Sequence, residues 1–308
     1  MNPSRRTFLK AGLGMSAAFL LPSADLCAQA APLLQKKIPS SGESIPIIGL
    51  GTARRYEDIS TEAEKAPLIE TIRQFKQLGA RVIDTSASYG TAETVVGEIV
   101  ERLKIRNSLF LATKVSLRNG GREAGLAQVE QSFKKLRADK IDLIAVHNLR
   151  DTQTQLRLLR EMKQAGRIRY VGITTSFENQ YPEFEQTMKK ETLDFIQVDY
   201  ALDNRTAGQS ILPLAAERGF AVMINLPFGR DRLFSAVRNK KLPEWAAEFD
   251  CVTWAQFFLK YIVSHPAVTC AIPGMAKAEY VIDNLGAARG RLPDGPMRRR
   301  MEQFIDAV

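Results

Sequence analysis

The sequence predicts a single (β/α)8 TIM barrel of the α/β class over residues 31–308. Eight short β-rich runs follow residue 44, and most successive runs begin roughly 25 to 36 residues apart, the spacing of one βα unit. Amphipathic helical stretches lie between these runs. No linker-like change in composition divides the chain after residue 45, so we expect one domain.

The strands are expected, in chain order, at residues 45–50, 81–84, 109–113, 141–146, 170–173, 195–198, 221–225 and 268–272. Helices are expected at residues 62–78, 128–136, 154–164, 212–218, 232–239 and 253–263. Gly79, Gly166 and Gly219 follow three of these helices, as is typical of helix ends. The competing layout, a doubly wound open sheet, requires a glycine fingerprint after its first strand. Residues 12–17 match that fingerprint, but no strand precedes them.

The first 30 residues have the features of an export signal. Arg5 and Arg6 form an arginine pair, residues 11–21 are apolar but too short to span a bilayer, and small residues suit cleavage after Ala30. The pattern resembles a twin-arginine signal, which implies the twin-arginine export machinery as a partner and a periplasmic location. An ordinary amphipathic helix and a lipoprotein signal at Cys27 are the alternatives, and the large Leu26 disfavours the second.

The composition is that of a soluble globular protein, because 45% of the 308 residues are hydrophobic and 25% are charged. The net charge of +9 suits an anionic ligand such as a dinucleotide. The densest basic run, at residues 298–300, indicates a solvated helix face rather than a nucleic-acid site. We expect Cys251 and Cys270 to be free thiols and no metal site, because the Cys and His residues lack ligand spacing.

Four chemically complementary side chains follow separate strand-like runs: Asp84, Tyr89, Lys114 and His147. In a barrel the carboxyl ends of the strands converge on one mouth, so residues distant in sequence can meet there. Free tyrosine, with a pKa of about 10, is a poor acid or base at neutral pH. A neighbouring ammonium is expected to lower that pKa, a carboxylate can hold the ammonium, and the imidazole can hydrogen-bond a substrate oxygen. Such a set can protonate a carbonyl while a hydride arrives from elsewhere.

The chain resembles the aldo/keto reductase family over roughly residues 45–289. The resemblance rests on motifs at residues 49–52, 84–93, 113–114, 147–148, 166–172, 272–274 and 283–286. It implies an NAD(P)H-dependent carbonyl reductase on a (β/α)8 barrel. By the same resemblance, Tyr89 is the general acid in reduction, Lys114 and Asp84 tune it, and His147 orients the substrate carbonyl.

The resemblance also implies the residues that hold the cofactor. Gln197 is expected to bond the nicotinamide carboxamide, while the turn at 272–274 and a helix N-terminus near Lys277 suit the adenosine end and the phosphates. The full expected set is Gly51, Thr52, Thr174, Thr175, Gln197, Asn225, Gly274, Lys277, Asp283 and Asn284.

Several cofactor positions depart from the pattern of the family. The family usually has a Ser-Asn pair where this chain has Thr174 and Thr175, and an aromatic residue where it has Asn225. Lys277 is the one basic residue of its loop, and Arg230 and Arg232 are candidates to compensate. NADP(H) is favoured over NAD(H) as the cofactor.

Two functions follow from these patterns. The first is reduction of a small aldehyde, ketone or sugar, in a pocket that the short tail after Arg291 leaves open. Phe228, Trp245 and Trp254 could line this pocket, although packing within its helix is the favoured role for Trp254. The alternative is a nucleotide-binding, redox-responsive partner protein with weak catalysis, which the altered residues Thr175 and Asn225 suggest. The sequence leaves the substrate, the physiological direction and the oligomeric state open.

Overall fold

The computed structural model describes residues 32–308. The expected export signal, at residues 1–30, lies outside the described residues. No helix among residues 32–308 is long and apolar enough to cross a membrane.

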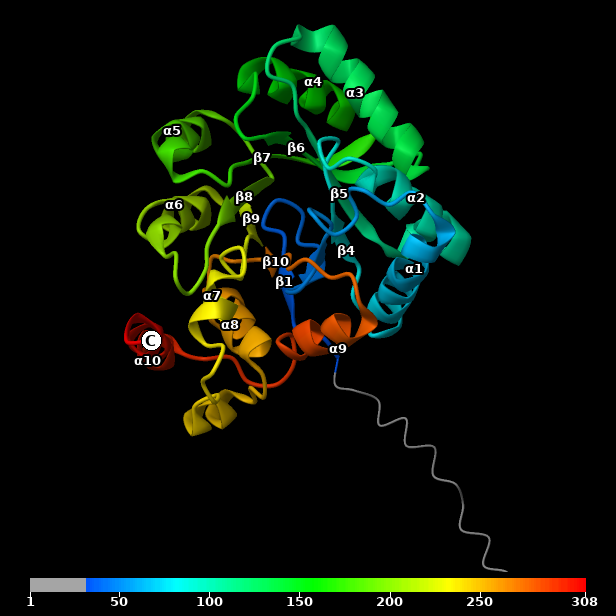
Figure 1. Ribbon diagram of the computed structural model, residues 1–308. Coiled ribbons are helices and arrows are strands. Elements are labelled where there is room, and N and C mark those ends of the chain that lie inside the picture. The colour runs from blue at the N-terminus through cyan, green and yellow to red at the C-terminus, as the bar shows by residue number, and fades with distance from the viewer. Residues whose placement is uncertain (1–31) are drawn as a thin grey trace, which may run out of the picture. The chain divides into compact units, whose positions relative to one another are not determined.

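Eight parallel strands form one sheet in which every strand pairs with its neighbour in the chain (Figure 1). Parallel bridges from Ile48 to Ala271 and from Gly51 to Gly274 join the first strand to the last, so the sheet closes into a barrel. The predicted fold class is therefore confirmed. The strands are β3 (Leu50–Gly51), β4 (Val82–Asp84), β5 (Phe110–Val115), β6 (Ile141–His147), β7 (Ile168–Thr174), β8 (Phe195–Asp199), β9 (Ala221–Asn225) and β10 (Cys270–Ala271).

Helices form an outer ring around these strands (Figure 1). Their apolar faces pack on the barrel, and Thr61 begins the first helix with a reciprocal capping box to Glu64. The helices are α1 (Glu62–Gln77), α2 (Ala92–Leu103), α3 (Gly121–Leu136), α4 (Thr152–Gln164), α5 (Tyr181–Lys190), α6 (Ile211–Arg218), α7 (Arg232–Ala236), α8 (Trp254–Val263), α9 (Ala278–Gly286) and α10 (Gly295–Asp306).

The first expected strand, at residues 45–50, is wrong as one continuous element. Its start belongs to an antiparallel hairpin of β1 (Gln35–Lys37) and β2 (Ser44–Pro46), and only its end enters the barrel as β3. Ile38 and Ile45 of this hairpin pack against the residues that begin the barrel strands, such as Val82, Phe110 and Phe195. The hairpin therefore covers the amino end of the barrel and leaves the carboxyl end for a site.

Two expected helix bounds change, and the tail leaves the barrel mouth open as expected. The expected helix at 232–239 is shorter, because α7 ends at Ala236, and α3 begins at Gly121 rather than at residue 128. The tail after Arg291 carries a helix of its own, α10, which packs beside α8 rather than across the barrel mouth, since Phe304 contacts Trp254 and Trp245. The two tryptophans are thus packing residues and do not line the active-site cavity.

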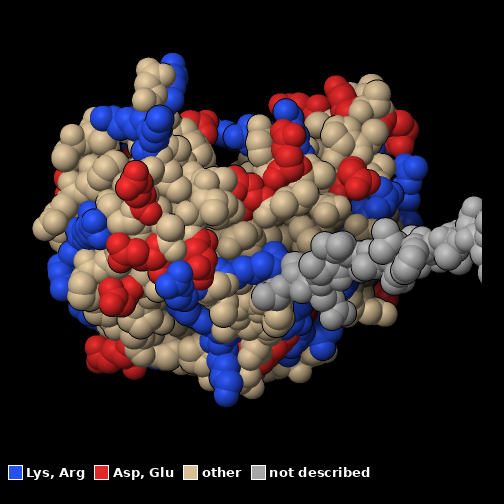
Figure 2. Space-filling model, turned by 90° about the horizontal axis from the view of Figure 1, so that it is seen from below, with Lys and Arg blue, Asp and Glu red and all other residues tan. Residues whose placement is uncertain are grey.

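The basic run at 298–300 lies on α10 but is not simply a solvated face. The Arg298 guanidinium stacks 4.1 Å from the centroid of the Tyr261 ring and donates to the Ser264 hydroxyl at 2.7 Å. On the face in Figure 2, acidic and basic side chains are interspersed rather than gathered by sign. Cys251 and Cys270 are buried free thiols, as expected.

Candidate active site

Adjacent parallel strands bring three of the four candidate catalytic residues to one end of the barrel. Asp84 ends β4, Lys114 lies one residue before the end of β5, and His147 ends β6. Tyr89 lies in the loop between β4 and α2, and its ring meets the His147 ring edge-on with centroids 5.8 Å apart. The four side chains therefore form one cluster at the barrel mouth.

Asp84 and Lys114 form a buried ion pair beneath this cluster. The Lys114 Nζ donates to Asp84 Oδ2 at 2.7 Å and to the Thr85 carbonyl at 2.7 Å. Burial disfavours the ammonium, but the charge of Asp84, together with hydrogen bonding to Asp84 and Tyr89, outweighs burial and raises the pKa of Lys114. The lysine is therefore a fixed cation, 5.1 Å from the centroid of the Tyr89 ring.

The Lys114 ammonium acts to lower the pKa of Tyr89, as expected, but the net shift of that pKa is upward. Burial is the strongest influence and raises the pKa of the Tyr89 phenol, while Lys114 offsets only part of that effect. Desolvation thus outweighs a single nearby charge. The phenol is protonated at neutral pH, which is the state a proton donor needs.

His147 is neutral and is held from one side by two hydroxyl groups. Burial, followed by the charges of Lys114 and Arg150, lowers the pKa of His147 to about 3. The hydroxyls of Ser86 and Ser88 each lie 3.2 Å from its Nδ1. These two serines were not among the expected site residues. Their spacing of two within the segment after Asp84 was the available signal.

A close backbone contact fixes the loop that carries Tyr89. Gly90 has a φ of 48°, and a Cβ added there would lie 2.3 Å from the Glu57 carbonyl oxygen. That same oxygen accepts a hydrogen bond from the Thr91 N–H at 2.7 Å. Only glycine permits both this φ and this approach, so Gly90 determines where Tyr89 sits.

The cluster opens into a cavity of about 370 Å³ at the barrel mouth. Asp84, Tyr89 and His147 line it, while Lys114 lies buried behind them. Six of the ten expected cofactor residues also line it: Gly51, Thr52, Thr174, Gln197, Asn225 and Gly274. Catalytic and cofactor candidates thus share one cavity.

A model of the aldo/keto reductase family matches residues 47–302, a range that includes the whole lining of this cavity. The chain belongs to the aldo/keto reductase family.

Relatives of known activity and solved structures agree with this assignment. The methylglyoxal reductase YeaE of Escherichia coli strain K12 is 28% identical over 256 residues, which are 81% of this chain and 88% of that protein. The aldo-keto reductase YhdN of Bacillus subtilis strain 168 is 30% identical over 200 residues, 61% of this chain and 60% of that protein.

A solved aldo/keto reductase from Klebsiella pneumoniae, in complex with NADP and acetate, has a TM-score of 0.70 at 25% identity, covering 86% of this chain and 93% of that one. As a member of the family, the chain is an NAD(P)H-dependent carbonyl reductase and hence an oxidoreductase.

The cavity of this aldo/keto reductase suits an amide-bearing cofactor ring. Asn225 donates through Nδ2 to the Thr175 carbonyl at 3.2 Å, which leaves its Oδ1 buried without a hydrogen-bond partner. The Gln197 Oε1 accepts from the Thr174 hydroxyl at 2.9 Å, so its orientation is fixed. An unpartnered buried acceptor is costly, and a carboxamide N–H is one group that can satisfy it. The side-chain amides of Asn225 and Gln197 therefore fit a nicotinamide carboxamide.

Four expected cofactor residues lie outside the lining of the cavity. The Thr175 hydroxyl donates to Gln180 Oε1 at 2.5 Å and holds the loop after β7. Asp283 accepts from Thr253 Oγ1 at 2.7 Å and so joins α9 to α8, and Asn284 is buried beside it. Lys277 immediately precedes α9 and contacts Glu279 at 3.6 Å. Their contact with a cofactor stays a prediction.

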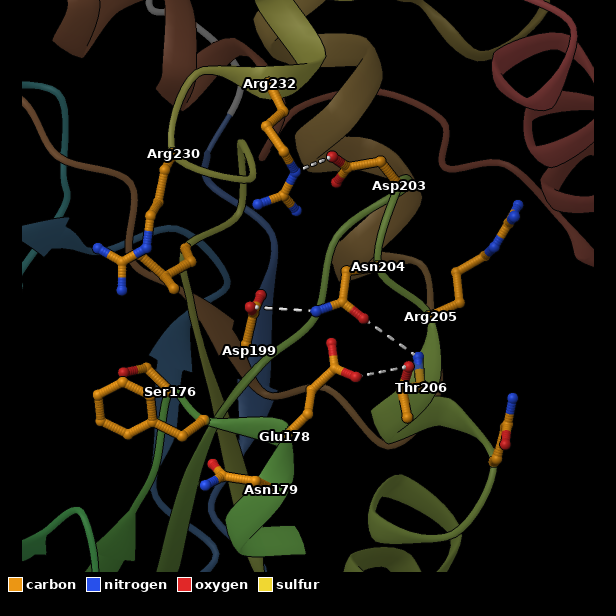
Figure 3. Close-up of a pocket in the computed structure, with 13 residues that line it drawn as sticks. Ser176, Glu178, Asn179, Asp199, Asp203, Asn204, Arg205, Thr206, Arg230 and Arg232 are labelled. Atoms are coloured by element: carbon orange, nitrogen blue, oxygen red, sulfur yellow. Dashed lines mark hydrogen bonds and ion pairs between the residues drawn. The ribbon is translucent and has the colours of Figure 1, made fainter.

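Of Arg230 and Arg232, the two candidates to compensate for the missing basic residues, one lines the cavity. Arg230 lies on its wall, whereas Arg232 pairs with Asp203 at 2.8 Å and faces elsewhere (Figure 3). Arg54 and Arg55, which sequence reasoning did not single out, also line the cavity. Phe228 lines it as expected and packs on Phe234 with ring centroids 4.9 Å apart. No cluster of metal-ligating side chains occurs within residues 32–308.

Proposed function

We propose that the chain reduces a small aldehyde or ketone to an alcohol, with the proton supplied by the Tyr89 hydroxyl and NADP(H) as the cofactor. The observation that carries this proposal is the shared cavity of Asp84, Tyr89 and His147, with Lys114 buried behind it. When bound, the nicotinamide supplies the hydride.

Tyr89 and Lys114 divide the proton transfer between them. Burial keeps the phenol protonated until a substrate oxygen gains negative charge and takes the proton. The phenolate that remains is stabilised by the Lys114 ammonium, which Asp84 holds in place at 2.7 Å. The main role of Lys114 is thus to stabilise the Tyr89 phenolate after the proton has left, rather than to bring the pKa of the free Tyr89 phenol down to neutral pH.

His147 orients the carbonyl. Nδ1 of the neutral ring has one lone pair, which the hydroxyl of Ser86 or of Ser88 can fill; with Nδ1 as the acceptor, the single proton of the ring lies on Nε2. An Nε2–H can donate to the substrate oxygen without transferring a full charge. The imidazole is therefore a positioning donor, and Tyr89 is the acid.

The test of the acid is Tyr89→Phe, which removes the transferable proton and keeps the ring. We expect turnover of a generic aldehyde to fall by about 10²- to 10⁴-fold, with NADPH affinity within about threefold of the wild type. Steady-state kinetics and nucleotide fluorescence titration measure the two effects. Wild-type turnover in this variant would refute the role of Tyr89.

The preference for NADP(H) has support from charge and from relatives. Arg54, Arg55 and Arg230 line the cavity, and Lys277 lies beside the N-terminus of α9. Solved reductases from Klebsiella pneumoniae hold NADP and NADPH. Gln197, Asn225 and Thr174 would hold the nicotinamide end.

The twin-arginine pattern at residues 1–30 motivates a periplasmic location, reached through the twin-arginine export machinery with the cofactor already bound. A periplasmic enzyme of this kind needs to retain its nucleotide. Mass spectrometry of the protein purified from periplasm is expected to find NADP(H) at near one equivalent. Finding NAD(H) instead contradicts the cofactor preference, and finding no nucleotide contradicts loading before export.

A redox-responsive partner protein with weak catalysis remains the second candidate, because Thr175 and Asn225 depart from the family pattern at the nicotinamide. The presence of Tyr89 and His147 in one cavity, with Lys114 buried behind them, favours catalysis instead. Rapid turnover of a panel of simple aldehydes is the result that separates the two.

A further inference from the structure

Two consecutive residues of β5 hold the segment that carries Tyr89, one before it and one after it. The segment connects β4 to α2. Before Tyr89, the Thr85 carbonyl accepts from Lys114 Nζ at 2.7 Å. After it, Oε1 of Glu93, the second residue of α2, accepts from the Thr113 hydroxyl at 2.6 Å. The chain on either side of the acid is therefore attached to the same short piece of strand.

The two attachments lie on opposite faces of β5, because successive side chains of a strand alternate in direction. Lys114 points into the barrel, where it also meets Asp84. Thr113 points toward the layer of helices, where it meets Glu93. The inner attachment belongs to the catalytic ion pair itself. The outer one is separate from that pair, and none of the interactions assigned to the reaction so far involves it.

The burial of Glu93 calls for more than the usual role of an acid at the start of a helix. Glu93 lies in the first turn of α2, where a negative charge complements the helix dipole, but an exposed carboxylate does this as well. Glu93 is only 1% exposed. Burial raises the pKa of its carboxyl, opposed by hydrogen bonds from Thr113 and Ser132 and by the charges of Lys135 and Lys114. Since burying a carboxylate costs free energy, the dipole alone does not account for its position.

Close packing of α2 against α3 encloses Glu93 behind β5. Gly97 lies one turn further along the same face of α2. A Cβ added at Gly97 would lie 2.1 Å from the carbonyl oxygen of Lys135, a residue of α3. The missing side chain thus lets α3 approach, and the buried Ser132 of α3 comes within hydrogen-bonding reach of the Glu93 carboxylate. The carboxylate is therefore held against Thr113.

We propose that Glu93 is a positioning residue of the reductase, acting through its bond to the Thr113 hydroxyl. The bond fixes the start of α2, and with it the position of Tyr89 relative to Lys114. The link from helix to acid is short, because the Ala92 N–H donates to the Tyr89 carbonyl at 2.9 Å. The anchoring stands on these contacts alone, whereas its effect on turnover rests on the proposed function of Tyr89 as the acid.

Four single variants separate the bond from the bulk of the side chains. Glu93→Met and Thr113→Val remove the bond and keep a similar shape, whereas Glu93→Gln keeps an acceptor and Thr113→Ser keeps the hydroxyl. We expect kcat for a generic aldehyde to fall about tenfold in the first two and to stay within about threefold of the wild type in the second two, because displacement of the acid slows proton transfer. NADPH affinity, measured by fluorescence titration, is expected to stay within about threefold in all four. Since Glu93→Met and Thr113→Val remove the same bond, their combination should lose no more activity than either alone.

Two further measurements distinguish positioning from a general structural role. Apolar replacement of both partners of a buried bond can be nearly neutral, so we expect the Tm of the combined Glu93→Met and Thr113→Val variant within about 2 °C of the wild type while its kcat falls. Amide hydrogen exchange at Tyr89 and Ala92 should quicken about tenfold in Glu93→Met and not in Glu93→Gln. The matched control is Thr71→Val, which removes another buried hydroxyl, bonded within α1 at 2.8 Å, and should leave kcat and these exchange rates unchanged.

Wild-type kcat and wild-type exchange in Glu93→Met overturn the proposal. An equal fall of kcat in Glu93→Gln also overturns it, because the charge rather than the bond would then matter. A fall in Tm of more than about 5 °C in the combined variant identifies a structural role instead. Faster exchange in Glu93→Met, beside a wild type that turns over no aldehyde, overturns the proposed reductase function and leaves the anchoring of the segment standing.

Discussion

At the scale of single residues, desolvation and charge act in opposite directions on Tyr89. Burial favours the neutral phenol, while the Lys114 ammonium favours the phenolate. The balance keeps the proton on the free protein, yet it leaves a cation in position for the anion formed during reduction. The Asp84–Lys114 pair therefore stabilises a charge that exists only after proton transfer, which is where such stabilisation accelerates a reaction.

The two serines beside His147 give a prediction at the same scale. Ser86→Ala with Ser88→Ala removes both hydroxyls from Nδ1, so the neutral ring is free to carry its proton on either nitrogen. We expect kcat/KM to fall about tenfold, which corresponds to about 1.4 kcal/mol, as the proton leaves Nε2 in part of the population.

Steady-state kinetics measure this effect, and ¹⁵N NMR of the histidine reports the tautomer directly. Ser88→Thr, which keeps a hydroxyl, is the matched control and is expected to retain most of the activity. An unchanged tautomer and rate in the double alanine variant contradicts the positioning role.

At the scale of elements, the loop between β4 and α2 depends on one glycine. In Gly90→Ala, the new Cβ would lie 2.3 Å from the Glu57 oxygen, and a φ of 48° is strained for alanine. We expect a loss of about 2–4 kcal/mol of unfolding free energy and a fall in kcat of at least about tenfold, because relief of the contact moves Tyr89.

Gly166→Ala is the control that separates the effect of backbone strain from the effect of displacing Tyr89. Gly166 also has a positive φ, of 73°, but nothing lies within 4 Å of its added Cβ. It should lose stability through backbone strain, about 1 kcal/mol, and keep full activity. Chemical denaturation and initial rates of both variants test this. Equal kcat in Gly90→Ala and the wild type would show that the loop does not position Tyr89.

Elements with clear periodicity were predictable from the sequence, and the exceptions have physical causes. β6 and β9 match their expected runs because a buried parallel strand is nearly continuous in apolar residues. The run at 45–50 was wrong because its apolar residues serve two structures, the hairpin and β3, and period alone cannot divide them. Within the site, the cluster was predictable because strand ends converge, whereas the sign of the Tyr89 pKa shift depends on burial, which no local pattern encodes.

At the scale of the whole molecule, the closed barrel separates stability from function. Lys36 holds the β1–β2 hairpin against the amino end of the barrel. Its Nζ donates to the carbonyls of Val263, His265 and Val268 at distances between 2.6 and 2.9 Å. The loop between α8 and β10 therefore joins the hairpin, and Arg298 of α10 bonds the adjacent Ser264 at 2.7 Å. These contacts lie at the amino end of the barrel, whereas the catalytic cluster lies at the carboxyl end, so changes there should alter stability without altering the chemistry.

His265 makes this junction sensitive to acid. Burial, with the nearby charges of Arg298 and Lys36, lowers its pKa to about 4 from an ordinary value near 6.5. The unfolded chain therefore binds a proton more readily than the folded protein between these two pH values. Stability is highest above pH 6.5 and falls as the pH drops toward 4.

His265→Asn should remove this part of the acid sensitivity, because the amide oxygen can still accept from the Ala267 N–H, as Nδ1 does at 3.2 Å, and carries no proton to titrate. Since the side chain is only half-buried and partly screened by solvent, we expect about 1 kcal/mol of the loss between pH 6.5 and 4.5, or roughly 1.5–2 °C in Tm, to disappear. Calorimetric Tm of the variant and of the wild type at each pH measures the slope. If Tm falls with pH as steeply in His265→Asn as in the wild type, acid destabilises the protein through other groups. A shallower fall of Tm with unchanged kcat would assign this part of the acid sensitivity to the junction rather than to the active site.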